Sequence, residues 1–159
     1  GAKVISTASS QAKLDFLKEL GADHCINYVD QDLLEEIGRY TNNKGVNLVV
    51  DPVGGHVLEN SLKAIGYRGR VVTVGNAGRE TRKFDLGGLM GMNQSITGVF
   101  LGAEIATDRA YNMIQSRIEG VANGDYKVII DRTFPLSEAK EAHEFIESRQ
   151  AIGRVLLIP

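Results

Sequence analysis

Short apolar runs alternate with amphipathic segments along this chain, and that alternation limits the folds it can adopt. Lys3–Ser6 and Val46–Val50 have the length and apolar character of strands, whereas Gln11–Leu20 carries apolar residues at helical spacing. The alternation continues to the C-terminal run Gly153–Ile158. Because the links are short and each strand is followed by a helix, the pattern predicts an α/β fold with a doubly wound parallel sheet.

The boundaries of the expected elements follow from apolar spacing and turn residues. The expected strands are Lys3–Ser6, Ala22–Asn27, Val46–Val50, Arg70–Val74, Gln94–Phe100, Tyr126–Phe134 and Gly153–Ile158. The expected helices are Gln11–Leu20, Gln31–Arg39, His56–Ile65, Glu104–Asn123 and one from Ser137 to Arg149. The expected helix caps are Ser9 or Ser10, Asp30 and Ser137, and the expected turns are Asn42–Gly45 and Gly66–Gly69. Arg79–Asn93 is expected to be a loop with one helical turn, and Val46–Val50 a strand buried on both faces.

The composition of the chain excludes several classes of binding partner and site. Its 159 residues include 43% hydrophobic and 24% charged side chains with a net charge of -2, which suits a folded domain but not a nucleic-acid surface or an anionic membrane. No apolar run approaches the roughly 20 residues of a membrane helix, and the cytoplasm is the expected location. The single Cys25 excludes an intrachain disulfide, and no histidine lies near residues with metal-ligand spacing, so no metal site is predicted.

The first strand leads into its helix through hydroxyl residues, which outlines an anion site. Free N–H groups and the helix dipole favour negative charge there. In dinucleotide-binding units, the second strand usually ends in an acid that binds the ribose 2′-OH. This chain instead offers Ser9, Ser10 and Lys13 before the first acid, Asp15. These residues suit a 2′-phosphate, which favours NADP(H) over NAD(H). The alternative is an ordinary turn with a capping serine and a solvated lysine.

A second feature of this region is what it lacks. The glycine turn G-x-G-x-x-G, which holds the pyrophosphate in such units, does not occur in the 159 residues. The first strand of the chain has the character of a second strand. We therefore expect the sheet to lack its first strand–helix unit.

Five segments of the chain occur in the same order as similar segments of a known protein family. They are Gly21–Tyr28, Asp51–Gly55, Gly69–Gly75, Ile96–Val99 and Glu147–Gly153. Together they resemble the medium-chain dehydrogenase/reductase superfamily on its zinc-free side, most closely NADPH:quinone oxidoreductases of the zeta-crystallin type. The resemblance covers essentially the whole chain. It implies that residues 1–125 are most of a Rossmann-like NAD(P)-binding domain, and that 126–159 return to complete a GroES-like catalytic domain. It also implies a missing N-terminal domain, so that the isolated piece would be inactive.

The resemblance implies contacts with the adenosine end of NADP(H). Ser9, Ser10 and Lys13 would hold the 2′-phosphate, and Tyr28 would lie beside the adenosine. Tyr28 could equally be a strand-end aromatic residue that packs on a helix.

The nicotinamide end would meet two other strand ends. The turn Val74, Gly75 and Asn76 would contact the nicotinamide ribose side, and the backbone of Gly98, Val99 and Phe100 would meet the carboxamide. Val99 and Phe100 could instead be core residues. Asp51–Gly55 could be a tight turn with Asp51 as a structural cap rather than a base. No catalytic residue is assigned, because hydride transfer from the cofactor needs no acid, base or nucleophile at these positions.

The function that the resemblance implies is the cofactor-binding part of an NADPH-dependent oxidoreductase. Hydride would pass to a quinone or another α,β-unsaturated carbonyl. The family also implies a homodimer that pairs through the strand near residues 95–100. Three alternatives stay open: a zinc-type alcohol dehydrogenase, an enoyl reductase of the same superfamily, and a nucleotide-binding module without activity.

Overall fold

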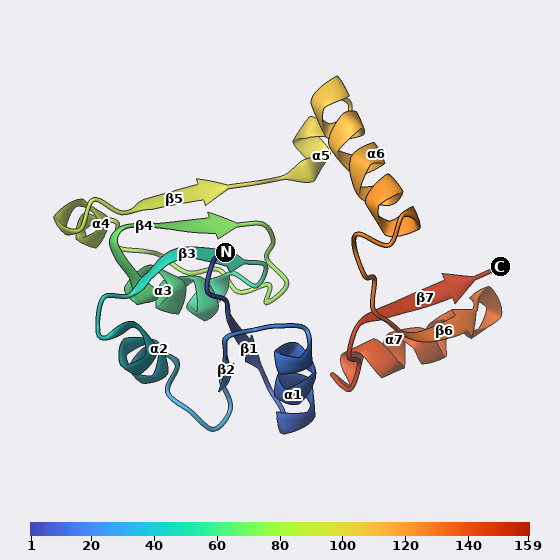
Figure 1. Cartoon of the computed structure of the whole chain (residues 1–159), viewed down its shortest axis with the longest axis horizontal. Helices are drawn as coiled ribbons and strands as arrows, with labels where there is room; N and C mark the ends of the chain where they lie inside the picture. The colour runs from blue at the N-terminus through green and yellow to red at the C-terminus, as the bar shows by residue number, and fades with distance from the viewer. The chain divides into compact units, whose positions relative to one another are not determined.

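A computed structural model describes all 159 residues of the chain (Figure 1). The chain forms two compact units, Gly1–Leu101 and Gly102–Pro159. Each unit contains parallel strands joined by helices, as the α/β pattern predicts. The expected domain boundary after residue 125 stays a prediction about the complete protein.

The first unit contains five strands in two parallel groups. The strands are β1 (Ile5–Ala8), β2 (His24–Asn27), β3 (Val46–Asp51), β4 (Ile65–Thr73) and β5 (Ser95–Gly98). One group has the order β1-β2 and the other β3-β4-β5, with parallel pairing throughout. Each expected strand of this region is present, so the strand predictions are confirmed to within a few residues.

The two groups are separate because β1 and β3 are not hydrogen bonded to each other. In the doubly wound order 3-2-1-4-5-6, the first strand stands between the second and the fourth. With β1 and β2 as the second and third strands, the place between β1 and β3 is that of the first strand. A buried cluster of Ile26, Ile37 and Ala64 nevertheless joins both groups in one core.

Four helices accompany these strands: α1 (Gln11–Glu19), α2 (Leu33–Thr41), α3 (Gly55–Ala64) and α4 (Gly87–Gly91). The expected cap of the second helix is wrong. Asp32 caps α2 by accepting the N–H of Glu35 at 2.8 Å, because the helix begins at Leu33. The side chain of Asp30 accepts from Asn27 Nδ2 at 2.6 Å instead.

The expected turn Gly66–Gly69 lies within β4, which runs from Ile65 to Thr73 and so begins earlier than expected. These residues are nevertheless skipped in the pairing with β3, since Ile65 pairs with Val46 and Arg70 with Leu48. Arg68 has a φ of 59° and donates its N–H to Met92 O at 2.8 Å. The segment is therefore an irregularity within the strand, in keeping with its turn-like composition.

The strand β3 is covered on one face only, which corrects the expectation of burial on both. Val49 packs against a cluster that contains Val71 of β4 and Leu58 of α3. Leu48 and Val50 are 55% and 60% exposed on the other face. A sheet in a doubly wound fold is buried by two layers of helices, and none of the helices of Gly1–Leu101 covers these two side chains.

The second unit begins within a short helix and ends in a pair of parallel strands. Its elements are α5 (Leu101–Glu104), α6 (Asp108–Ala122), β6 (Ile130–Pro135), the 3-10 helix η1 (Leu136–Glu138), α7 (Ala139–Glu147) and β7 (Arg154–Ile158). The single helix expected over Glu104–Asn123 is divided, because Thr107 adopts an extended conformation and caps α6. Ser137 lies within η1 and is not the cap of α7, whose preceding residue is Glu138.

Candidate cofactor site

The carboxyl ends of β3, β4 and β5 lie in register at one edge of their sheet. Asp51 pairs with Thr73, which pairs in turn with Gly98. The pairing extends one residue further, since Val74 N–H donates to Asp51 O and Val99 N–H donates to Thr73 O, both at 2.9 Å. The structure therefore brings the two predicted groups, Val74–Asn76 and Gly98–Phe100, to adjacent positions. Ligands of open α/β sheets bind at this edge.

Asp51 has a structural role at the start of the first turn. Its side chain is only 1% exposed. Oδ1 accepts the N–H groups of Val53 at 2.8 Å and Gly54 at 3.1 Å, which stabilises the turn into α3. A carboxylate occupied in this way is not placed as a base, which supports the structural role of Asp51, although its bonds hold the turn before α3 and not the first turn of the helix itself.

The turns after β3 and β4 are bonded to each other beyond the strands. Ala77 N–H donates to Pro52 O at 3.1 Å, and Gly78 N–H donates to Val53 O at 2.9 Å. A Cβ atom on Gly75 would lie 2.8 Å from Pro52 O, so a side chain at that position would push the two turns apart. The paired turns form a backbone platform at this edge of the sheet.

The third part of the edge is open to solvent. A Cβ atom on Gly98 would have no neighbour within 4 Å. Val99 is 51% and Phe100 76% exposed, so neither is a core residue of this unit. The space above the Gly98 backbone is where a flat ring could approach the sheet edge.

The predicted adenosine-end residues meet at the carboxyl edge of β1 and β2. Tyr28 N–H donates to Ala8 O at 3.2 Å, which places Tyr28 next to the strand end that leads into Ser9 and Ser10. Ser10 is the N-cap residue of α1 but makes no side-chain bond to the helix backbone. Lys13 is half-buried in the first turn of α1. Tyr28 is 50% exposed and does not pack as a buried aromatic residue.

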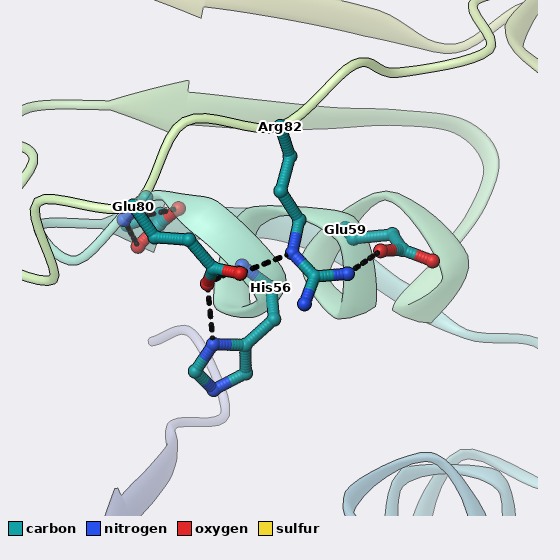
Figure 2. Close-up of polar contacts among 6 residues, drawn as sticks. His56, Glu59, Glu80 and Arg82 are labelled. Atoms are coloured by element: carbon teal, nitrogen blue, oxygen red, sulfur yellow. Dashed lines mark hydrogen bonds and ion pairs between the residues drawn. The ribbon is translucent and has the colours of Figure 1, made fainter.

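A charged cluster near the platform has no counterpart in the sequence-based predictions. Figure 2 shows Glu80 between His56 and Arg82, with Arg82 reaching on to Glu59. The N–H and imidazole of His56, followed by Arg82, lower the pKa of the Glu80 carboxyl to about 2. No local motif could have revealed the cluster, because 24 residues separate His56 from Glu80.

A shallow cavity lies elsewhere on this unit. It has a volume of about 580 Å³ and lies between the end of α3, residues 83–92 and the beginnings of β4 and β5. That is the amino edge of the strands, opposite the platform. No group of three or more His, Cys, Asp or Glu side chains is placed to hold a metal ion. None of the helices has the length and apolar character needed to cross a membrane.

Comparison with known proteins assigns the chain to a family. Residues 1–131 match the family model described as zinc-binding dehydrogenase. The chain belongs to the zinc-binding dehydrogenase family. This membership confirms the resemblance to medium-chain dehydrogenases/reductases and the Rossmann-like fold. Relatives that match the whole chain are named as reductases and oxidoreductases.

Several relatives of this zinc-binding dehydrogenase family member align with it along its full length. A 2-haloacrylate reductase from Burkholderia sp is 30% identical over 100% of the chain and 49% of its own length. The structure of Escherichia coli quinone oxidoreductase complexed with NADPH is 33% identical with a TM-score of 0.88, covering 100% of this chain and 50% of that one. The structure of an NAD-dependent alcohol dehydrogenase is 30% identical with a TM-score of 0.80, covering 100% and 45%. The chain thus spans about half the length of the curated relatives it matches.

Proposed function

We propose that this chain is the cofactor-binding part of an NADPH-dependent reductase that transfers hydride to a quinone or another α,β-unsaturated carbonyl. The observation that carries the proposal is the backbone platform at the carboxyl ends of β3, β4 and β5, with open space above Gly98. The names of two relatives, a quinone oxidoreductase and a 2-haloacrylate reductase, support an electron-poor acceptor.

The residues at the two sheet edges fit the two ends of a dinucleotide. Ser9, Ser10 and Lys13 would bind the adenosine 2′-phosphate, with Tyr28 beside the adenosine. Val74, Gly75 and Asn76 would contact the nicotinamide ribose side, and the backbone of Gly98, Val99 and Phe100 would contact the carboxamide. No residue of this chain is assigned to the pyrophosphate, because the glycine turn that binds it is not in these 159 residues.

The bound cofactor supplies the hydride, and the protein determines where its ring lies. The open space beside the backbone of Gly98 would let the ring approach the sheet closely. The apolar side chains of Val74, Val99 and Phe100 would exclude water from the ring once it is bound. The chain's own contribution is therefore orientation and exclusion of water.

A titration with NADPH and NADH, followed by nicotinamide fluorescence, tests the proposal. We expect tighter binding of NADPH, and we expect Lys13→Ala to reduce the NADPH preference by about 10- to 100-fold, the value of one charge-assisted bond. Lys18→Ala is the matched control, since Lys18 lies in the last turn of the same helix. Equal binding of both cofactors by the unaltered protein would contradict the assignment of Ser9, Ser10 and Lys13.

A second candidate function is NAD-dependent alcohol dehydrogenation. It is favoured by the 30% identity with an NAD-dependent alcohol dehydrogenase over the whole chain. The same titration separates the two, because that function requires the tighter complex to be with NADH. Oxidation of simple alcohols by the complete protein, without quinone reduction, would establish it.

We also propose that the protein is a homodimer that pairs through β5. This strand pairs only with β4, so its other edge is free. The chain beyond it carries exposed Val99, Phe100 and Leu101. A free, apolar strand edge favours association, and pairing of two copies would cover it.

A further inference from the structure

The segment after the Gly75–Gly78 turn runs back over the N-terminus of α3 (Figure 2). Glu80 Oε2 accepts the backbone N–H of His56 at 3.0 Å and lies 2.9 Å from His56 Nδ1. Glu80 Oε1 accepts from Arg82 Nε at 2.5 Å, and Arg82 Nη1 donates to Glu59 Oε2 at 3.1 Å. The carboxylate therefore uses both oxygens, one toward α3 and one toward its own loop.

Glu80 replaces the local cap that α3 lacks. The N-cap residue of α3 is Gly54, which has no side chain to accept an N–H of the first turn. A carboxylate at a helix N-terminus is stabilised by the free N–H groups and by the helix dipole. Glu80 supplies that carboxylate from 24 residues further along the chain. A Cβ atom on Gly55 would lie 2.6 Å from Glu80 Oε2, so the close approach also needs a glycine there.

Asn76 lies between two attachments of its turn. Before it, Val74 N–H is bonded to Asp51 O. After it, the N–H groups of Ala77 and Gly78 are bonded to the turn after β3, and Glu80 then attaches the chain to α3. The side chain of Asn76 itself lies against Gly54. Glu80 thus holds the loop to α3 a short distance along the chain after Asn76.

We propose that Glu80 is a positioning residue for cofactor binding, acting through the Gly75–Asn76 turn. This inference rests on the proposed function, because it assumes that the turn contacts the nicotinamide side of NADPH. Glu80 does not touch the cofactor itself. Its carboxylate attaches the loop to the first turn of α3, and this attachment holds Asn76 in the position that the cofactor meets.

The test compares Glu80→Ala with Glu59→Gln in the complete protein. Glu59→Gln removes a carboxylate from the same cluster but leaves both contacts between Glu80 and His56. Two quantities are measured: hydrogen exchange of the His56, Ala77 and Gly78 amides without cofactor, and the Kd for NADPH. We expect Glu80→Ala to raise the exchange rates and the Kd about tenfold, and Glu59→Gln to change the Kd less than twofold.

A third variant separates positioning from overall stability. Glu80→Gln keeps an oxygen that can accept the His56 N–H, and we expect it to restore most of the affinity lost in Glu80→Ala. This variant also keeps the test decisive if Glu80→Ala does not fold. Faster amide exchange without a change in Kd would overturn the inference and leave the proposed function intact. Failure of the unaltered protein to bind NADPH would instead overturn the proposed function, and this inference with it.

Discussion

The side-chain oxygen of Asn76 lies only 2.5 Å from the position that a Cβ atom on Gly54 would take. Gly54 also has φ 74° and ψ -160°, a conformation that is essentially restricted to glycine. The turns after β3 and β4 are thus in contact through a glycine on one side and an amide side chain on the other. This contact makes Gly54 the most sensitive position of the platform.

Gly54→Ala should lower the free energy of unfolding by about 1–3 kcal/mol, because alanine is strained in this backbone conformation and would displace Asn76. Urea unfolding monitored by circular dichroism measures the change. The matched control is Gly88→Ala in α4, where a Cβ atom would have no neighbour within 4 Å. Equal stabilities of the two variants would contradict the packing of Asn76 on Gly54.

Gly98→Ala should separate ligand binding from folding. The added methyl group enters open space, so we expect the free energy of unfolding to change by less than about 0.5 kcal/mol. If the nicotinamide ring approaches this backbone, the same methyl group should raise the Kd for NADPH about tenfold. Calorimetric titration measures the affinity, and Gly88→Ala again serves as the control. An unchanged Kd would exclude Gly98 from the cofactor site.

The attachment of Glu80 should weaken in acid. Its folded-state pKa of about 2 lies below the ordinary value of 4.5, so the unfolded chain binds the proton first as the pH falls. The contribution of Glu80 to stability is therefore complete above about pH 4.5 and is lost toward pH 2. We expect the difference in Tm between the unaltered protein and Glu80→Gln to shrink across this range. A difference that does not vary with pH would show that the charge of Glu80 contributes nothing.

Phe100→Glu should disrupt the proposed dimer. Phe100 is 76% exposed beside the free edge of β5, and pairing would bring two added carboxylates close together. Sedimentation velocity should show the dimer dissociating at concentrations at least tenfold higher than for the unaltered protein. Met90→Glu is the control, since Met90 is 83% exposed on α4, which precedes β5, whereas Phe100 follows that strand. If the unaltered protein sediments as a monomer, the dimer proposal is wrong.

The sequence predicted the strands well because their signals are local. Apolar, β-branched runs such as those of β3 and the end of β4 need no distant partner to be recognised. The caps were predicted less well. Asp30 and Asp32 are both residues that cap helices, and the composition of this segment does not reveal that α2 begins at Leu33.

Features that depend on distant contacts could not be predicted. The exposure of Leu48 and Val50 depends on which helices cover the sheet, not on the residues of β3. The bond between Glu80 and the N-terminus of α3 joins residues 24 positions apart with no motif between them. The grouping of Val74–Asn76 with Gly98–Phe100 was predictable, because parallel strands end at the same edge of a sheet.

The carboxylate that caps α3 comes from beyond β4, and this has a consequence for the order of folding. A helix with a local cap can complete its first turn as soon as its own segment forms. In α3 that turn must wait until β4 has paired with β3 and the chain has reversed at residues 75–78. We therefore expect the first turn of α3 to form late, and fraying of this helix end and opening of the loop above it to occur as one motion.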